Sequence, residues 1–370
     1  MAEIILAATL AALRDKLPTD PTSNPHELAS LIKTWGYELG FAELGFSDTD
    51  LDEAESRLSQ WLGRGYHGDM DYMQKHGRRR TSPADLVPGT VRIISARMNY
   101  QTENRATSEA LLRDGNKGYI ARYALGRDYH KLMRNRLQKL ATRIEAETGP
   151  FGYRVFVDSA PVMEKPFAAK AGIGWQGKNT NIISEQAGSW FLLGEIYTDL
   201  PLPTGLPAQD HCGTCNACID VCPTGAIVAP YVLDATRCIS YLTIESKRAI
   251  PEKFRAALGN RIFGCDDCQL VCPWNKFAGM TKEPDFAPRH GLDNAELISL
   301  FLWDETEWEH KTRGSALRRP GYVGWLRNIA VALGNAPTST EIVTALTSRA
   351  DHPSELVREH VRWALEQHRG

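Results

Sequence analysis

The sequence lacks a hydrophobic run long enough to cross a membrane. A spanning helix needs about 20 consecutive apolar residues, whereas the one stretch that could imitate a targeting segment, Ile4–Leu13, is short and is followed by Arg14 and Lys16. No small-residue cleavage pattern ends this stretch, so we interpret it as a short amphipathic helix. We therefore expect a cytoplasmic protein without membrane contact, in a reducing compartment that disfavours structural disulfides.

A charge excess of either sign is also missing. The 43 Lys and Arg residues nearly balance the 45 Asp and Glu residues, whereas a nucleic-acid-binding domain usually carries a basic excess. Only a local basic patch could therefore bind nucleic acid. With 42% hydrophobic and 24% charged residues among 370, the chain has an ordinary globular composition and is long enough for two or three packed units.

Cysteine is absent from residues 1–211 and from residues 273–370. The eight cysteines have the spacing Cys212-x2-Cys215-x2-Cys218-x3-Cys222-Pro223, then Cys238, then Cys265-x2-Cys268-x3-Cys272-Pro273. The first run matches the bacterial ferredoxin pattern, in which three cysteines hold one [4Fe–4S] cluster and the fourth crosses to another. The second run lacks one cysteine of that pattern, and we expect Cys238 to supply it.

This spacing predicts two [4Fe–4S] clusters. The expected ligands of the first cluster are Cys212, Cys215, Cys218 and Cys272, and those of the second are Cys222, Cys238, Cys265 and Cys268. Zinc sites favour two separated C-x2-C pairs rather than three cysteines at consecutive two-residue gaps, and the expected compartment disfavours disulfides. Two such clusters conduct electrons one at a time, so the electrons need an acceptor elsewhere in the chain.

Residues 26–205 show strand and helix patterns in alternation. We expect helices at 26–39, 51–64, 128–148 and 168–172, and strands at 40–46, 86–100, 153–157, 181–184 and 190–196. Beyond residue 290 we expect only helices, at 296–303, 322–333, 339–348 and 354–368. The predicted organisation is an N-terminal extension (1–25), an α/β or α+β catalytic domain with a central sheet (26–205), a ferredoxin-like double-cluster module (206–285) and an α-helical tail (286–370).

A glycine-rich segment lies in the predicted catalytic domain. Gly172-x-Gly174-x-x-Gly177 matches the dinucleotide-binding pattern, but it is not followed by a clear helix, and no acidic residue lies about twenty positions on in a βαβ context, so we reject a Rossmann interpretation. We expect these glycines to let the backbone lie flat against a large ring system. Asp158 follows the apolar run 155–157, at the end of a predicted strand, where α/β sheets commonly place functional groups. An aspartate at such a position commonly only ends a strand or caps a turn.

Several motifs together resemble one family. They are Val157-Asp158-Ser159, the loop AGIGWQGKN at 171–179, Cys238-Ile-Ser-Tyr241, Gly264-Cys-Asp-Asp-Cys268, GYHGDMDY at 65–72 and LVPG at 86–89. Together they closely resemble the epoxyqueuosine reductases, over the chain from about residue 26 to its end. That family is cobalamin-dependent, is related to the reductive dehalogenases, and reduces epoxyqueuosine to queuosine at the wobble position of tRNA.

The resemblance implies residue roles. Asp158 is expected to be the proton donor to the opening epoxide oxygen, which requires that burial raise its pKa. The expected cobalamin contacts are Arg80, Asp158, Ile182, Ser240, Cys265 and Asp266, although the run of three arginines at 78–80 leaves the choice among them open. No D-x-H-x-x-G motif is present, which agrees with base-off cobalamin without a histidine ligand from the protein. We also expect a monomer and a low-potential electron donor of the flavodoxin or ferredoxin type.

The helical tail resembles HEAT-type repeats. Arg327 and Arg358 each precede a similar apolar helix face, and so short a repeat array should pack on the redox body. The expected tRNA contacts are Lys247, Arg248, Arg313, Arg318 and Arg319. Without the family resemblance, these cations would be an ordinary solvated surface.

Two other functions stay open at this point. One is a cobalamin or iron–sulfur reductase of a small molecule, similar to a dehalogenase, which has no need of basic helical repeats. The other is a noncatalytic electron carrier, which has no need of Asp158.

Overall fold

The computed structural model describes residues 24–369. The predicted N-terminal helix and almost all of the predicted extension at 1–25 lie outside this range. None of the helices within residues 24–369 is long and apolar enough to cross a membrane.

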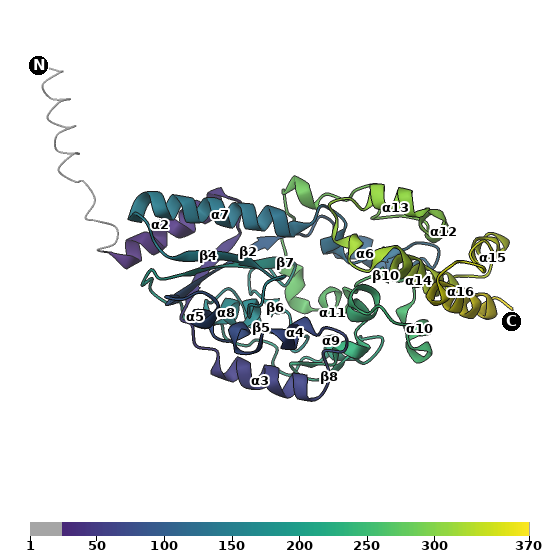
Figure 1. Cartoon of the computed structure of the whole chain (residues 1–370), viewed down its shortest axis with the longest axis horizontal. Helices are drawn as coiled ribbons and strands as arrows, with labels where there is room; N and C mark the ends of the chain where they lie inside the picture. Colours follow the sequence, from purple (N-terminus) through teal and green to yellow (C-terminus); the bar gives the residue numbers. More distant parts are fainter. Residues whose placement is uncertain (1–23, 370) are drawn as a thin grey trace, which may run out of the picture.

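A four-stranded sheet forms the centre of the N-terminal half (Figure 1). Its strands, in spatial order, are β1 (Glu43–Ser47), β2 (Arg92–Asn99), β7 (Phe191–Thr198) and β4 (Tyr153–Val157). All three strand pairs are antiparallel. The predicted central sheet is therefore present, but the rule that places ligands at the carboxyl ends of parallel strands does not explain the position of Asp158 at the end of β4.

Helices cover both faces of the sheet. On one face lie α2 (Pro25–Glu38) and α7 (Tyr129–Thr148), and on the other lie α3 (Asp52–Gly63), α5 (Pro83–Leu86) and α8 (Glu164–Lys170), as Figure 1 shows. Helix α7 buries Met133, Leu137, Leu140 and Ile144, which follow one another at intervals of three or four residues. These side chains pack on Ile94, Val157 and Ile196 of the sheet, so α7 is fixed directly above β4 and β7.

The predicted elements of this half are mostly confirmed, with differences in extent. The expected strand at 86–100 is confirmed only from residue 92, where β2 begins, and Leu86 is instead the last residue of the helical turn α5, which Pro83 starts. The predicted helix at 168–172 begins earlier, at Glu164. Sequence analysis did not predict α4 (Tyr72–Lys75) or α6 (Arg105–Arg113), and the predicted strand at 181–184 is the two-residue β6 (Ile182–Ile183), paired with β5 (Trp175–Gln176).

The cysteine-rich segment consists of short elements. They are α9 (Ala217–Asp220), β8 (Ile227–Ala229), β9 (Val232–Leu233), α10 (Glu252–Leu258), β10 (Arg261–Phe263) and α11 (Asp267–Leu270). Each ferredoxin-like run contributes one cysteine to a short helix, Cys218 in α9 and Cys268 in α11. Strand β10 pairs in parallel with β3 (Tyr119–Ile120), which joins this segment to the preceding half of the chain.

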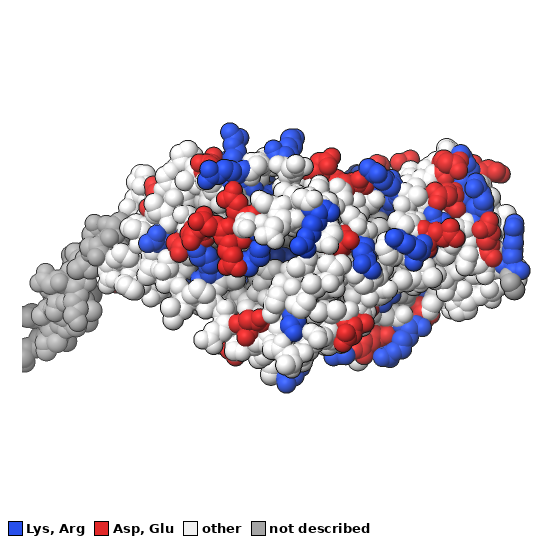
Figure 2. All heavy atoms as spheres, turned by 90° about the horizontal axis from the view of Figure 1, so that it is seen from below, with Lys and Arg blue, Asp and Glu red and all other residues white. Residues whose placement is uncertain are grey.

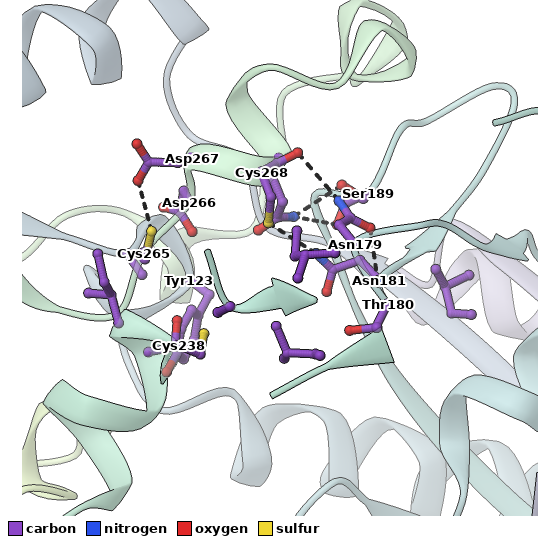
Figure 3. Close-up of a pocket in the computed structure, with 18 of the residues that line it drawn as sticks. Tyr123, Asn179, Thr180, Asn181, Ser189, Cys238, Cys265, Asp266, Asp267 and Cys268 are labelled. Carbon is purple, nitrogen blue, oxygen red and sulfur yellow. Dashed lines mark hydrogen bonds between the residues drawn. The ribbon is translucent and has the colours of Figure 1, made fainter. Parts of the chain in front are cut away.

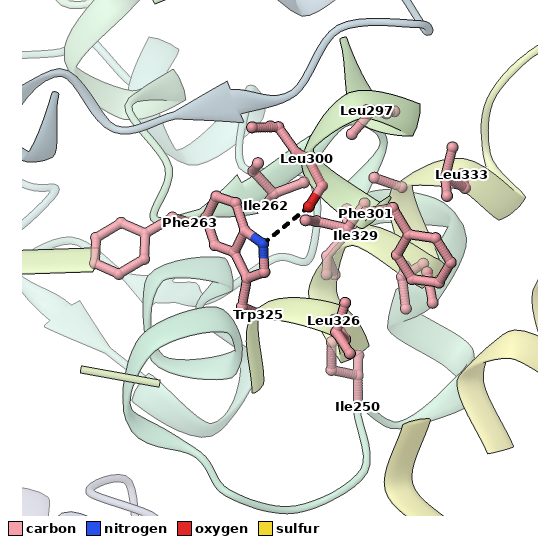
Figure 4. Packing of buried hydrophobic residues seen from close by; sticks show 14 of the residues in the cluster. Ile250, Ile262, Phe263, Leu297, Leu300, Phe301, Trp325, Leu326, Ile329 and Leu333 are labelled. Carbon is pink, nitrogen blue, oxygen red and sulfur yellow. Dashed lines mark hydrogen bonds between the residues drawn. The ribbon is translucent and has the colours of Figure 1, made fainter. Parts of the chain in front are cut away.

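The C-terminal part is helical, as predicted. It contains α12 (Leu297–Leu302), α13 (Glu305–Lys311), α14 (Gly321–Gly334), α15 (Thr340–Thr347) and α16 (Glu355–Gln367), of which α13 was not expected. Helix α14 lies at the centre, and Figure 4 shows Trp325 and Ile329 of α14 beside Phe263 and Leu300. The Trp325 indole donates a hydrogen bond of 3.2 Å to the Leu300 carbonyl.

Two polar side chains of α14 donate hydrogen bonds to backbone carbonyls of the cysteine-rich segment. Arg327 is fully buried, and its guanidinium donates hydrogen bonds to the carbonyls of Leu242, Ser246 and Arg248. The next residue, Asn328, donates to the carbonyls of Thr243 and Ile262. Burial lowers the pKa of Arg327 to about 10, and these carbonyls, rather than a carboxylate, solvate its charge. The helical tail and the segment after Cys238, which includes a π-helical turn at Tyr241–Glu245, therefore form one packed unit.

We predict that Arg327→Gln lowers the free energy of unfolding by about 3 kcal/mol or more, because each buried carbonyl left without a donor costs roughly 1–3 kcal/mol. Urea unfolding followed by circular dichroism measures this. Arg362→Gln is the matched control, because the Arg362 side chain is 64% exposed, and it should change stability by less than about 0.5 kcal/mol. Equal midpoints for the two variants would contradict the role of Arg327.

Candidate active site between two cavities

Two cavities meet at Asp158. The inner cavity has a volume of about 410 Å³ and is bordered by Cys222, Cys238, Cys265 and Cys268 together with the loop around β6. The outer cavity has a volume of about 450 Å³ and is bordered by Arg80, Glu245, Arg318 and Arg319. Tyr123, Tyr129 and Asp158 line both cavities. Asp158 therefore lies on the wall between a chamber rich in thiols and one bordered by arginines.

Two residues at the start of α7 hold the Asp158 carboxylate. The Tyr129 hydroxyl donates to one oxygen, and His130 Nε2 lies 2.5 Å from the other. The opposite ring nitrogen of His130 lies 2.5 Å from Asp128 Oδ1. Asp128 also caps α7, because the same oxygen accepts the backbone N–H of His130. The helix cap thus orients the imidazole toward Asp158.

The protonation of this pair differs from the prediction. Burial alone would raise the pKa of Asp158, but the hydrogen bond and positive charge of His130 and the Tyr129 hydroxyl outweigh it, so the pKa is lowered. The expectation of a raised pKa is therefore wrong. Burial opposes the charged form of His130, yet its hydrogen bonds to Asp128 and Asp158 raise its pKa to about 9. Near neutral pH the shared proton rests on the imidazole.

Sequence reasoning missed Tyr129 and His130 as site residues. They are separated from Asp158 by nearly thirty positions, and Asp128-Tyr-His130 has the pattern of an ordinary helix N-terminus. Only the packing of α7 on β4 brings them to the carboxylate.

The eight cysteines are all free of disulfides, and they form two groups. Burial raises the pKa of the Cys218 thiol to about 11, and Cys212, Cys272 and Cys215 are the neighbouring thiols that raise it further. The neighbouring thiols that raise the pKa of Cys268 are Cys238, Cys218 and Cys222. Cys268 in turn raises the pKa of Cys265. The two sets of four predicted from the spacing are thus each brought together, and Cys218 and Cys268 lie where the sets approach each other.

The surroundings of the thiols suit the anionic sulfurs of bound clusters. The backbone N–H of Ala226 donates to Cys222 Sγ at 3.2 Å, and the Trp175 indole donates to Cys212 Sγ at 3.5 Å. Hydrogen bonds of this kind stabilise cluster sulfurs and tune their potentials. Within residues 24–369, no three Cys, His, Asp or Glu side chains converge around a single metal-ion position.

Five of the six predicted cobalamin contacts line the inner cavity: Asp158, Ile182, Ser240, Cys265 and Asp266. Figure 3 shows Cys265 and Asp266 on one side of this cavity, with Asn179, Thr180 and Asn181 on another. The Asp266 carboxylate accepts hydrogen bonds from the Tyr119 hydroxyl and the Arg122 N–H, and burial raises its pKa. Amides, hydroxyls and aliphatic side chains of this kind fit a corrin, which has amide side chains and an apolar face.

Arg80 lies in the outer rather than the inner cavity. It is 6% exposed and donates to the Tyr72 carbonyl, whereas Arg78 and Arg79 are exposed. Of the three arginines left open by the sequence, Arg80 is therefore the one that is buried and borders a cavity shared with Asp158.

The glycines of the loop at 172–177 have a different role from the one expected. A Cβ on Gly174 would lie 2.3 Å from the Ile183 carbonyl oxygen, and one on Gly177 would lie 2.3 Å from the Ile183 side chain. Neither glycine borders the inner cavity. They allow β5 to approach β6 closely, so the prediction that they lie against a large ring is wrong.

The predicted tRNA contacts are dispersed. Arg318 and Arg319 border the outer cavity, and Lys247 donates to the Arg319 carbonyl. Arg248 pairs with Asp69 at 2.9 Å, and Arg313 is exposed. On the face shown in Figure 2, basic and acidic side chains alternate rather than forming a continuous basic stripe. Of the five predicted tRNA contacts, only Arg318 and Arg319 thus border a cavity that contains Asp158.

Comparison with known proteins agrees with this geometry. A family model described as epoxyqueuosine reductase QueG matches residues 80–159, and one described as a 4Fe-4S double cluster binding domain matches residues 211–275. The epoxyqueuosine reductase of Pseudomonas aeruginosa is 59% identical over 93% of this chain and 96% of its own length. The chain belongs to the epoxyqueuosine reductase family. The resemblance, the oxidoreductase class and the double-cluster module predicted from the sequence are confirmed.

Other members of the family extend the match. The Escherichia coli enzyme is 54% identical over 92% of this chain and 90% of its own length. A crystal structure of epoxyqueuosine reductase with an epoxyqueuosine-modified tRNA-Tyr stem loop has a TM-score of 0.85 at 29% identity, covering 93% of this chain and 91% of that one. The Streptococcus thermophilus structure has a TM-score of 0.81 at 27% identity, covering 92% and 90%. The mixed α/β fold is thus that of the family.

We predict that Cys238→Ser removes one cluster and leaves the other. The iron and acid-labile sulfide content should fall to about half, because Cys238 belongs with Cys222, Cys265 and Cys268 while the other four cysteines stay intact. Iron analysis and electron paramagnetic resonance of the anaerobically reconstituted protein measure this. Ser240→Ala, two residues away, serves as control and should retain both clusters. A Cys238→Ser protein with full iron content would refute the assignment.

Proposed function

We propose that this chain reduces epoxyqueuosine to queuosine at the wobble position of tRNA, using cobalamin and electrons relayed through two [4Fe–4S] clusters. The observation that carries the proposal is the position of Asp158. It borders both a chamber adjoining four cysteines and a chamber adjoining three arginines, in a chain 59% identical to an epoxyqueuosine reductase.

The cofactors fit the inner cavity and its surroundings. Cys222, Cys238, Cys265 and Cys268 would hold the cluster beside the cavity, and the other four cysteines would hold the second cluster. Ile182, Ser240, Cys265 and Asp266, with the amides of Asn179 and Asn181, would hold base-off cobalamin, with Arg80 and Asp158 on its outer side. When bound, cobalamin supplies a centre that accepts single electrons and can attack carbon.

Electrons would enter at the cluster farther from Asp158. Cys215 of that set is exposed, whereas Cys265 and Cys268 border the inner cavity. A low-potential donor of the flavodoxin or ferredoxin type would therefore bind near Cys215. The electrons would then pass between the two sets of cysteines where Cys218 and Cys268 are neighbours.

The protonated His130 and the Asp158 carboxylate form the acid of the reaction. His130 Nε2 donates to Asp158, and Tyr129 keeps the second carboxylate oxygen in place. As negative charge develops on the epoxide oxygen, a proton would pass to it from Asp158 while His130 replaces that proton. A Bacillus subtilis epoxyqueuosine reductase is described with an aspartate-bearing catalytic loop swung out of the active site, which supports a catalytic role for the aspartate that follows β4.

The substrate would enter through the outer cavity. An unstacked wobble base can be splayed into a pocket, and Arg318 and Arg319 lie at the entrance that leads to Asp158. Lys247, Arg248 and Arg313 would contact phosphates farther from the cavity. We also propose that α14 and α16 form HEAT-like repeats that present this entrance, in a monomer.

The proposed domains are 26–205, 206–285 and 286–370. The last two share one hydrophobic core that also includes Ile120, Ala124 and Leu125 from the first. Their mutual positions would therefore change little when tRNA binds.

The test is a direct assay. The protein is reconstituted anaerobically with iron, sulfide and cobalamin and supplied with a low-potential reductant. tRNA containing epoxyqueuosine is then added and analysed by nucleoside mass spectrometry. We expect conversion to queuosine. Unchanged tRNA with fully loaded protein would overturn the proposal.

We predict that Asp158→Asn lowers kcat by about a hundredfold or more, because an amide cannot transfer the proton and general acid catalysis typically contributes 10²–10⁴-fold. Iron content and cobalamin absorbance should match those of the wild type. Asp199→Asn, at the far end of β7, is the control and should retain kcat. Activity of Asp158→Asn close to that of the wild type would show that the proton comes from elsewhere.

We predict that Arg318→Ala raises KM for tRNA several-fold with little effect on kcat. Loss of one phosphate contact should also reduce the slope of log(kcat/KM) against log salt concentration by about 1. Arg143→Ala is the matched control. Arg143 lies near the end of α7 that is distant from Asp158, and it forms an exposed ion pair with Glu38 of α2. An unchanged salt slope in Arg318→Ala would argue against contact with tRNA.

A further inference from the structure

A buried carboxyl group beside Asp158 has no role in the proton transfer described so far. Glu164 lies in the first turn of α8 and borders the inner cavity together with Asp158. Its Oε2 atom is buried and has no hydrogen-bond partner among residues 24–369. The neighbouring Glu195, in the middle of β7, is fully buried, and both of its carboxyl oxygens lack a partner within the same range.

An unpaired buried carboxylate is costly, so these two groups favour the protonated form. Burial, and then the charge of Asp158, raise the pKa of Glu164 to about 8. Burial raises the pKa of Glu195 well above its ordinary range, and the negative charges of Glu164 and Asp158 raise it further. Near neutral pH the Asp158–His130 pair thus adjoins a second acid that still carries its proton.

The charged and titratable groups that act on Glu164 come from every element around it. They are Asp158 after β4, Lys165 of α8, His130 and Tyr129 of α7, Arg80 and, on β7, Glu195 and Tyr197. Asp158 favours the protonated form, whereas Lys165, His130 and Arg80 oppose it. The Lys165 ammonium is turned away, because it donates to the Thr180 carbonyl.

The proposed reaction needs two protons. One proton, with the breaking of the first C–O bond of the epoxide, leaves a hydroxyl group. The second proton, with the breaking of the remaining C–O bond, releases that oxygen as water, and the two electrons from the clusters complete the alkene. The Asp158–His130 pair holds one proton. Its exposed side faces the outer cavity, which the substrate would fill, so a second proton must arrive from the protein side.

We propose that Glu164 supplies this second proton by passing it to Asp158 through a water molecule in the inner cavity, which both residues border. Glu164 ends the cycle as a carboxylate and recovers its proton from solvent once product leaves. It acts through Asp158 and does not touch the substrate, so it is a proton-relay residue. This inference rests on the proposed function.

The decisive variant is Glu164→Gln, which keeps the shape of the side chain but holds no transferable proton. In the reconstituted enzyme we expect kcat to fall by about tenfold or more, with KM for tRNA unchanged. The wild-type rate should fall as pH rises through about 8, where Glu164 loses its proton. In Glu164→Gln this alkaline limb, the fall in rate near pH 8, should be absent. The rate should then fall only at about pH 9, where His130 loses its proton. Glu164→Asp should partly restore both the rate and the limb.

A second readout does not depend on turnover. In infrared difference spectra, the carbonyl stretch of a protonated carboxyl should titrate near pH 8 in the wild type and be missing from Glu164→Gln. Glu147→Gln, at an exposed position of α7, is the matched control and should keep both this band and wild-type kinetics. Iron and cobalamin contents confirm that each variant is correctly assembled.

The outcomes separate the two proposals. Persistence of the band, or a wild-type rate and alkaline limb, in Glu164→Gln would overturn the relay. Loss of the limb in Glu164→Asp together with wild-type kcat would also overturn it. Failure of the wild type to convert epoxyqueuosine in tRNA would overturn the proposed function instead, while the infrared titration would still show whether Glu164 carries the proton.

Discussion

The contact between His130 and Asp158 is the interaction on which the site depends. It joins the first turn of α7 to the end of β4, and it exists because Met133, Leu137 and Leu140 hold α7 on the face of the sheet that contains Val157. Asp128 fixes the other side of the imidazole while capping the helix. One carboxylate thus serves both local structure and proton chemistry. A hydrogen bond between charged groups is stronger than a neutral one, so this arrangement also fixes the position of the wall between the two cavities.

The second requirement is a fixed relation between the thiols and this wall. Strand β10, which ends two residues before Cys265, pairs with β3, and the helical turn after Cys238 accepts hydrogen bonds from Arg327 and Asn328 of α14. The same helix follows directly after Arg318 and Arg319. Helix α14 therefore couples the cysteine-rich segment to the arginines of the outer cavity. The tail is part of the scaffold of the site, and a shift of α14 would alter both cavities together.

The sequence predicts those features of the fold and the site that depend on residues close together in the chain. The cysteine groups follow from spacing, because turns of two residues set the direction of successive thiols. The helices α2, α7 and α16 follow from the period of their buried residues, whereas α14 is buried without a break from Gly324 to Gly334. The order of the sheet, in which β7 lies between β2 and β4, could not be predicted from local patterns. The same holds for the partners of Asp158: the sign of its pKa shift is set by His130, which only the tertiary fold brings near. The role of Gly174 likewise depends on the position of Ile183, which its own segment does not reveal.

The buried carboxyl groups of Glu164 and Glu195 reduce the stability of the fold, because they lack hydrogen-bond partners among the described residues. Natural sequences usually pair or replace such buried acids, and departures from this rule concentrate at functional sites. Here Glu195 lies in the middle of β7, opposite Ser95, whose hydroxyl is also buried without a partner among the described residues. An apolar residue would pack there at less cost. The thiols that border the inner cavity come from the segment 222–268, as do Asp266 and Asp267, whereas Asp158 follows β4 and Glu164 belongs to α8. Under the proposed function, electrons would therefore reach this cavity from the segment that carries the thiols, whereas the protons of Asp158 and Glu164 would come from the side of the sheet.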